Sequence, residues 1–230
     1  MKASAIIVAA GSGTRLGLAL PKAFVRIDGQ SMLGRVLHTM RAVDSIGEVV
    51  IAAPDKMEAE ARAEVSAAGL EIPVKITAGG ERRQDSVRRA LALTSAEAEI
   101  IVVHDAARPF ATPAIFASSL QAVGAGIAGA IAAVPLADSL KLVDQNFVRS
   151  TVPRTRLWQA QTPQTFRREV LVAAHERAVR EHLTATDDAE LVEAAGGKIV
   201  VVEGSPLNLK VTTPDDLRMA EAIARSLFPR

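Results

Sequence analysis

Two positively charged side chains follow a glycine-rich turn near the start of the chain. The run IIVAAGSGTRLGLALPKAFV spans residues 6–25, where an apolar segment leads into Gly11 and Gly13 and then into Arg15 and Lys22. Glycines let backbone N–H groups approach a ligand closely. An arginine offers a planar fork for phosphate oxygens, and a lysine offers a point charge. The run predicts a polyphosphate-binding loop, which we favour over a simple turn with two solvated cations because all these features occur together.

The two best-known phosphate loops do not fit this run. A dinucleotide-binding loop needs a third glycine where Leu16 stands, and a P-loop needs Gly-Lys where Leu16 and Gly17 stand. The sequence therefore indicates neither an NAD-dependent dehydrogenase nor a Walker-type ATPase.

A carboxylate follows another apolar run, IIVV at 100–103. Asp105 would lie at the carboxyl end of a strand, where parallel sheets bind ligands, and a carboxylate there suits Mg²⁺. A purely structural alternative is an ion pair between Asp105 and Arg108. We interpret His104 as structural, and likewise the three histidines that lie in helical patterns, His38, His175 and His182.

The elements that must position these residues alternate along the chain. Strands are predicted at 5–9, 48–53, 74–78, 100–104, 129–134 and 198–203. Helices are predicted at 31–43, 55–68, 85–94, 113–123, 167–181, 187–195 and 214–226. This alternation predicts an α/β protein with a Rossmann-like, mostly parallel sheet and helices on both faces.

One segment interrupts the alternation. Between Pro135 and Pro163 we find no helical pattern, and the runs 139–143 and 147–152 flank the turn-forming tripeptide Asp-Gln-Asn. They predict a protruding β-hairpin arm. Because a lone hairpin is marginally stable, we expect the arm to pack against a second subunit in a homodimer. We therefore predict one domain over 1–230 with an arm subdomain at 136–156.

Composition restricts the remaining possibilities. The 230 residues are 49% hydrophobic, carry a net charge of +1 and include no cysteine. These values exclude disulfides and thiolate chemistry and do not favour nucleic acid or a membrane surface as a partner. No apolar run is long enough to span a membrane, and the apolar start leads into a charged loop, so we expect a cytoplasmic protein.

The motif AAGSGTRL at 9–16, followed by LPK at 20–22, resembles the signature of sugar-phosphate nucleotidyltransferases, in particular the branch that uses CTP. Further motifs are GGERRQDSV at 79–87, VHDAARPF at 103–110, LWQAQTPQTF at 157–166, TDDA at 186–189 and NLKVTTPDDL at 208–217. In this order they resemble the 2-C-methyl-D-erythritol 4-phosphate cytidylyltransferase family from the first strand to the last helix. The resemblance implies the nucleotidyltransferase fold and transfer of a cytidylyl group from CTP to that polyol phosphate, with release of pyrophosphate.

The resemblance also implies roles for individual residues. Those carried over as catalytic are Arg15, Lys22, Arg154 and Lys210. Those carried over as nucleotide-binding are Ala9, Ala10, Gly11, Gly13, Gly80, Glu81, Ser86, Asp105 and Ala106. Those carried over as binding the acceptor are Arg108, Ser139, Arg154, Thr186 and Lys210, with Ser139 and Arg154 reaching a partner's site. Asp105 would also hold Mg²⁺ or another divalent cation.

Without the resemblance, several of these segments have structural interpretations. Asp85 or Ser86 would cap a helix, and Thr186-Asp187 would be a capped helix start. Arg83 would pair within its loop or face solvent, and Lys210 would lie in a strand.

No protein nucleophile is needed for such a reaction, because the acceptor's phosphate is largely anionic near neutral pH. The protein must instead align two repelling anions and stabilise the charge that develops between them. Two alternatives remain open from the sequence. One is a cytidylyltransferase for another polyol phosphate, such as ribitol 5-phosphate, and the other is a non-catalytic nucleotide-binding domain.

Overall fold

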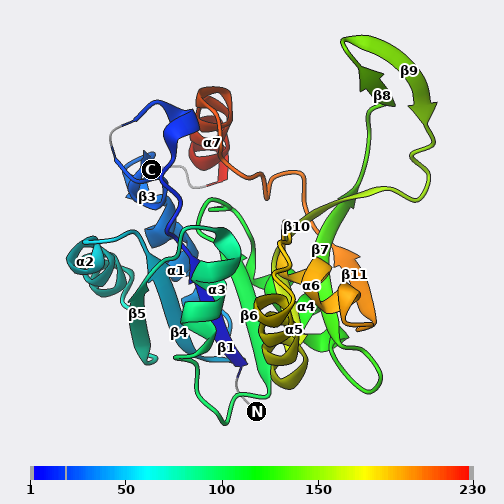
Figure 1. Cartoon of the computed structure of the whole chain (residues 1–230). Helices are drawn as coiled ribbons and strands as arrows, with labels where there is room; N and C mark the ends of the chain where they lie inside the picture. Colours follow the sequence, from blue (N-terminus) through cyan, green and yellow to red (C-terminus); the bar gives the residue numbers. More distant parts are fainter. Residues whose placement is uncertain (1–2, 19, 228–230) are drawn as a thin grey trace.

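Short runs of Ala, Val and Ile form the central sheet of the computed structural model shown in Figure 1. Such runs suit strands that are buried on both faces. The structure describes residues 3–18 and 20–227. In spatial order the seven strands are β11 (Ile199–Glu203), β7 (Gly129–Pro135), β10 (Trp158–Arg167), β6 (Ile100–Asp105), β1 (Ala3–Val8), β4 (Ile46–Ala53) and β5 (Val74–Ala78).

The predicted mostly parallel sheet is confirmed, with one strand that the sequence did not predict. β10 lies between β6 and β7 and pairs antiparallel with both, while the other neighbouring pairs are parallel. Its polar sequence, WQAQTPQTFR, contains a proline, which normally argues against a central strand. A shift of register between Ala160 and Gln164 accommodates Pro163 within the pairing with β7.

The predicted helices are present, with small differences at their ends. They are α1 (Met32–Arg41), α2 (Glu58–Ala68), α3 (Arg83–Leu91), α4 (Pro113–Ala122), α5 (Arg168–Arg180), α6 (Asp188–Ala194) and α7 (Pro214–Leu227). Short 3-10 turns at Thr14–Leu16 and Lys22–Phe24, and a small hairpin of β2 (Arg26–Ile27) and β3 (Gln30–Ser31), lie between β1 and α1.

Helices cover both faces of the sheet because successive strand side chains point to opposite sides. On β1, Ile7 packs with residues of α1, α2 and α4, whereas its neighbour Ile6 packs with residues of α3, α5 and α6. A third cluster joins α7 to the small hairpin and to the first 3-10 turn, and it includes Leu16, Phe110 and Val211.

The predicted hairpin arm is also confirmed. β8 (Leu140–Asp144) and β9 (Phe147–Val152) pair with each other and project away from the main sheet (Figure 1). Gln145 and Asn146 both have positive φ, as the tight turn of a two-residue hairpin requires. The arm exposes large apolar side chains, and Phe147 is 73% accessible.

No helix within the described residues has the length and apolar character needed to cross a membrane.

Candidate active site

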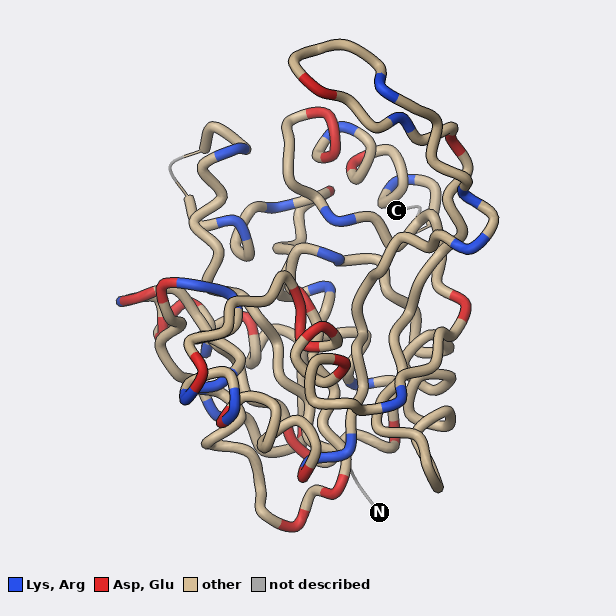
Figure 2. The backbone as a smooth tube through the Cα atoms, turned by 45° about the vertical axis from the view of Figure 1, so that its right-hand side comes forward, with Lys and Arg blue, Asp and Glu red and all other residues tan. Residues whose placement is uncertain are grey.

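A cleft of about 390 Å³ opens at the carboxyl ends of the parallel strands β1 and β6. Figure 2 shows Lys and Arg positions on several loops at the end of the sheet nearest the arm. The lining residues that the sequence predicted are Ala9, Ala10, Gly11, Gly13, Arg15, Lys22, Gly80, Glu81, Ser86, Asp105, Ala106 and Lys210. Those it did not predict are Val8, Ser12, Thr14, Ala23, Arg82, Arg83, Ala107 and Thr212.

The glycine-rich loop is folded against Lys22. Gly13 has a φ of 71°, and a Cβ atom at this position would lie 2.9 Å from the Cβ of Lys22. The backbone N–H of Lys22 donates to the carbonyl oxygen of Gly11 at 3.4 Å. Leu16, which replaces the third glycine of a dinucleotide loop, is 4% exposed and anchors the loop in the α7 cluster. Only glycine at position 13 allows this close approach without strain.

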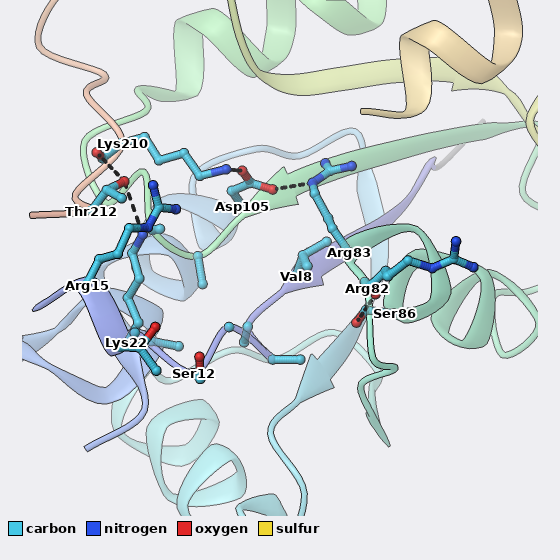
Figure 3. A pocket seen from close by; sticks show the side chains of 18 of the residues that line it. Val8, Ser12, Arg15, Lys22, Arg82, Arg83, Ser86, Asp105, Lys210 and Thr212 are labelled. Carbon is cyan, nitrogen blue, oxygen red and sulfur yellow. Dashed lines mark hydrogen bonds and ion pairs between the residues drawn. The ribbon is translucent and has the colours of Figure 1, made fainter. Parts of the chain in front are cut away.

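Three cations converge on the cleft. Figure 3 shows Arg15, Lys22 and Lys210 reaching into it from two separate loops. The ammonium of Lys22 lies 3.4 Å from the Oγ1 of Thr212. Burial, and then the nearby charge of Lys210, lower the pKa of Lys22 to about 8. Such a cluster of positive charge, partly removed from water, is a strong binding site for a polyanion.

Asp105 lies between two cations in the cleft. The Nε of Arg83 donates to its Oδ1 at 2.9 Å, and the Nζ of Lys210 donates to its Oδ2 at 2.7 Å (Figure 3). Burial alone would raise the pKa of Asp105, but Arg83 and Lys210 outweigh that effect and hold the pKa far below its ordinary range. The predicted alternative, an ion pair with Arg108, is wrong. Arg83, which we expected to pair within its loop or face solvent, instead joins three parts of the chain.

Lys210 lies in irregular backbone, not in the strand that its sequence suggested. The segment is held by Val211, which is fully buried and whose N–H donates to the carbonyl oxygen of Ala107 at 2.9 Å. The carboxylate of Asp216, in the first turn of α7, accepts from the backbone N–H groups of Thr212 and Thr213 at 2.8 Å each. The start of α7 therefore fixes the loop that carries Lys210.

A second loop forms the opposite wall of the cleft before α3. The Oγ of Ser86 accepts from the N–H of Gly80 at 3.0 Å and donates to the carbonyl oxygen of Arg82 at 3.2 Å. A Cβ atom on Gly80 would lie 2.3 Å from the Cβ of Asp85. Asp85, predicted as a helix cap, accepts from the backbone N–H of Arg82 at 3.3 Å. This loop thus presents close-packed backbone and the hydroxyl group of Ser86, and Arg82 and Arg83 line the cleft beside them.

The 2-C-methyl-D-erythritol 4-phosphate cytidylyltransferase family model matches residues 3–226. The chain belongs to this family. A relative from Deinococcus radiodurans, named as a cytidylyltransferase of this kind, is 44% identical over 222 residues, which are 96% of this chain and 89% of that protein.

Solved structures of cytidylyltransferases named for the same reaction agree with this fold. The crystal structure of the 2-C-methyl-D-erythritol 4-phosphate cytidylyltransferase from Thermus thermophilus has a TM-score of 0.82 and 34% identity, over 98% of this chain and 100% of that one. The 4-diphosphocytidyl-2C-methyl-D-erythritol synthase from Anaerococcus prevotii has a TM-score of 0.86 and 27% identity, over 97% and 96% of the two chains.

The family resemblance implied that five residues bind the acceptor, and four of them do not line the cleft of their own chain. Ser139 and Arg154 are exposed, and they lie where the chain enters β8 and leaves β9. Thr186 is exposed before α6, and its N–H and Oγ1 donate to Glu190 at 2.7 and 2.9 Å. Asp187, the predicted cap, accepts from the N–H of Glu190 at 3.0 Å.

The fourth of these residues, Arg108, is buried beneath the cleft. Its guanidinium donates to the carbonyl oxygens of Asn208 at 2.8 Å and Ala160 at 3.3 Å. These bonds tie the segment that precedes Lys210 to β10, so the geometry favours a supporting role over the direct contact with the acceptor that we predicted.

His104 is fully buried and supports the same region. Its Nδ1 lies 3.0 Å from the Oγ1 of Thr162, and its Nε2 lies 3.1 Å from the carbonyl oxygen of Arg108. Burial lowers the pKa of His104 to about 4, so its ring is neutral at physiological pH. The structural interpretation of His104 from the sequence is confirmed.

Arg83 and Arg82 are the charged cleft residues that sequence reasoning missed. Both lie beside predicted residues in the run GGERRQDSV, so proximity in sequence was one available signal. Nothing in that run indicates that Arg83 meets Asp105, which is 22 positions away.

Proposed function

We propose that this protein transfers the cytidylyl group of CTP to 2-C-methyl-D-erythritol 4-phosphate. A phosphate oxygen of the acceptor attacks the α-phosphorus of CTP and forms a new P–O bond. The bond between the α-phosphorus and the bridging oxygen to the β-phosphate breaks, and pyrophosphate leaves with that electron pair. The products are 4-diphosphocytidyl-2-C-methyl-D-erythritol and pyrophosphate, which balances the atoms and charges of the two substrates.

The observation that carries the proposal is the convergence of Arg15, Lys22 and Lys210 on one cleft beside Asp105. The uncatalysed reaction is slow because two anions must approach each other. Fixed cations in a partly desolvated cleft reduce that repulsion and stabilise the charge of the transition state without reorganisation. Phosphoryl transfer needs positioning and electrostatic stabilisation more than covalent catalysis by the protein, and the cleft supplies both.

The two walls of the cleft bind different parts of CTP. Gly11, Gly13, Arg15 and Lys22 bind the triphosphate, with Ala9, Ala10 and Ala106 forming the surface beneath the nucleotide. Gly80, Glu81 and Ser86 face the cytosine ring, where backbone groups and one hydroxyl can read its polar edge. Glycine at position 80 lets this wall pack directly against α3, because a Cβ atom there would collide with Asp85.

Lys210 binds the acceptor's phosphate, and the arm of a second subunit completes its site. Ser139 and Arg154 flank the arm and lie outside the cleft of their own chain. The arm also exposes Leu142, Val143, Phe147 and Val148, which are 53–73% accessible, as expected for a surface that packs on a partner. We infer a homodimer in which each arm, as a subdomain of residues 136–156, contributes Arg154 to the other subunit's site, beside Thr186.

A divalent cation such as Mg²⁺ fits the cleft if the substrate supplies most of its ligands. The described residues contain no group of three or more side chains that could hold a metal alone. Mg²⁺ commonly binds through one or two carboxylates together with substrate phosphates, and Asp105 supplies one ionised carboxylate beside the phosphate loop. When bound there, the cation would neutralise charge on the phosphates.

The direct test is pyrophosphate release with CTP, UTP or ATP, each combined with 2-C-methyl-D-erythritol 4-phosphate or ribitol 5-phosphate. We expect turnover that depends on CTP and on the erythritol derivative. Greater efficiency with ribitol 5-phosphate would replace the proposed acceptor. CTP binding without pyrophosphate release for any acceptor would favour the non-catalytic alternative.

Mixing two inactive variants tests the shared site. Arg154→Ala and Lys210→Ala homodimers should each be nearly inactive, because each lacks one cation in both sites. In randomly exchanged dimers, half of the molecules are mixed, and each mixed dimer has one intact site, so activity should return to about a quarter of the wild-type value. No recovery after demonstrated subunit exchange would place both residues in the same chain's site.

A further inference from the structure

A series of buried ion pairs leads from the cleft into the interior of the protein. The Nη1 of Arg83 donates to the Oδ2 of Asp188 at 2.6 Å, while its Nε holds Asp105. The side chain of Asp188 is 1% exposed, and its Oδ1 lies 2.9 Å from the Nε2 of the buried His175. Arg83 is therefore held at two corners of its guanidinium, by one carboxylate inside the cleft and one beneath it.

The two cations on Asp105 are held very differently. Arg83 contacts Oδ1 from within α3, and its side chain is 20% exposed. Lys210 contacts Oδ2 from an irregular loop, and its side chain is 42% exposed. A guanidinium bonded to two buried carboxylates is costly to displace, because either carboxylate would be left buried and unpaired. A half-exposed ammonium on a flexible stem exchanges partners at much lower cost.

Neighbouring contacts fix the backbone that carries Arg83. The side chain of Gln84 donates to the carbonyl oxygen of Leu183 and accepts from the N–H of Ala185, both at 3.2 Å. The Nη1 of Arg82 donates to the Oγ1 of Thr184 at 2.8 Å. The first turn of α3 is thus joined to the segment before α6 on both sides of Arg83.

We propose that Arg83, anchored by Asp188, is a positioning residue that fixes Asp105 through Oδ1. The other oxygen, Oδ2, can then leave Lys210 and contact the ligands of the cleft. The identity of those ligands rests on the function proposed above. A carboxylate that offers one oxygen suits Mg²⁺, which requires near-octahedral geometry. It is less suited to Ca²⁺, which readily takes both oxygens of a carboxylate.

Two substitutions separate this role from general stability. Asp188→Asn keeps the shape of the side chain but removes the charge that anchors Arg83. Arg83→Lys keeps a positive charge, but one ammonium cannot reproduce the fork that joins the two carboxylates. Glu48→Gln is the matched control. Glu48 is a buried carboxylate paired with Lys75, and it lies near the amino end of β4, whereas the cleft is at the carboxyl ends of the strands.

The main measurement is binding of Mn²⁺ to the complex of the protein with CTP, followed by electron paramagnetic resonance without an acceptor. We expect Asp188→Asn and Arg83→Lys to weaken Mn²⁺ binding by about tenfold or more, as is typical when a group that orients a metal ligand is removed. We also expect a higher half-activating Mg²⁺ concentration and weaker discrimination against Ca²⁺. CTP affinity in EDTA should change less than about twofold in Asp188→Asn, because Asp188 is buried and does not line the cleft.

Unchanged Mn²⁺ binding in both folded variants would overturn the inference. So would an equal loss in Glu48→Gln at a matched fall in melting temperature, because the effect would then be one of stability. If Mn²⁺ binding responds as expected but the wild-type protein releases no pyrophosphate with the proposed acceptor, the proposed function fails and the role of Arg83 stands.

Discussion

Lys22 should lose its proton only slightly above neutral pH, and this gives the capture of CTP a measurable pH dependence. Its pKa lies at about 8 instead of 10.5, because the ammonium is partly buried and lies near the charge of Lys210. About a tenth of the molecules then carry a neutral Lys22 at pH 7, and about nine-tenths do at pH 9. Since only the charged form attracts the triphosphate, kcat/KM for CTP should fall about tenfold between pH 7 and pH 9.

The assay is pyrophosphate release from pH 7 to 9.5 at constant ionic strength and subsaturating CTP. The acceptor's phosphate does not mask the effect, because its second pKa of about 6 keeps it ionised throughout this range. Bound triphosphate should raise the pKa of Lys22 again, so binding takes up a proton above pH 8. Calorimetry of CTP binding in two buffers with different ionisation enthalpies measures that uptake.

Lys22→Arg is the decisive comparison. A guanidinium stays charged throughout the range, so its profile should be flat, at a lower level because the point charge has been replaced by a planar fork. A flat profile for the wild-type protein, or the same fall in Lys22→Arg, would refute the reasoning.

Three further predictions follow from single features of the cleft. Arg15→Ala should lower kcat by roughly 10²–10³-fold; because Arg15 is exposed, the melting temperature should stay the same, and near-normal turnover would remove Arg15 from the site. Gly13→Ala should raise KM for CTP sharply, because φ is 71° and the new Cβ would meet Lys22. A normal KM would contradict this expectation, and a crystal structure of the variant would show how the loop accommodates the Cβ atom. His104, whose pKa falls from 6.5 to about 4 in the folded protein, takes up a proton more readily when unfolded. Its contribution to stability should therefore be lost as the pH falls from 6.5 to 4, up to about 3 kcal/mol. Urea unfolding of His104→Asn should show a smaller loss over that range, and an identical acid sensitivity would contradict the assignment.

Much of the site was predictable because its signals are local in sequence. The apolar run before Gly11 marks a first strand, and the loop after it carries both Arg15 and Lys22. The parallel arrangement of β1 and β6 then brings Asp105 to the same edge of the sheet. Helix periodicity and the loops that end strands depend on residues that are neighbours in the sequence, so they can be predicted from a single sequence.

β10 was not predictable in the same way. Its polar sequence and internal proline do not match a buried strand, yet it is held between β6 and β7 by partners distant in sequence. Lys210 likewise lies in irregular backbone, because Val211 and the first turn of α7 fix that segment more strongly than its own strand-like alternation does.

The sequence by itself determined the α/β sheet, the hairpin arm and the phosphate loop, because periodicity, turn residues and glycine conformations act over a few positions. Only the tertiary structure decided which charges meet. Arg83 joins Asp105 and Asp188, which are 22 and 105 positions away, and Lys210 meets Asp105 across a similarly long separation in sequence. The order of the strands and the packing of the helices set these distances, and Coulomb attraction depends on distance in space, whatever the separation along the chain.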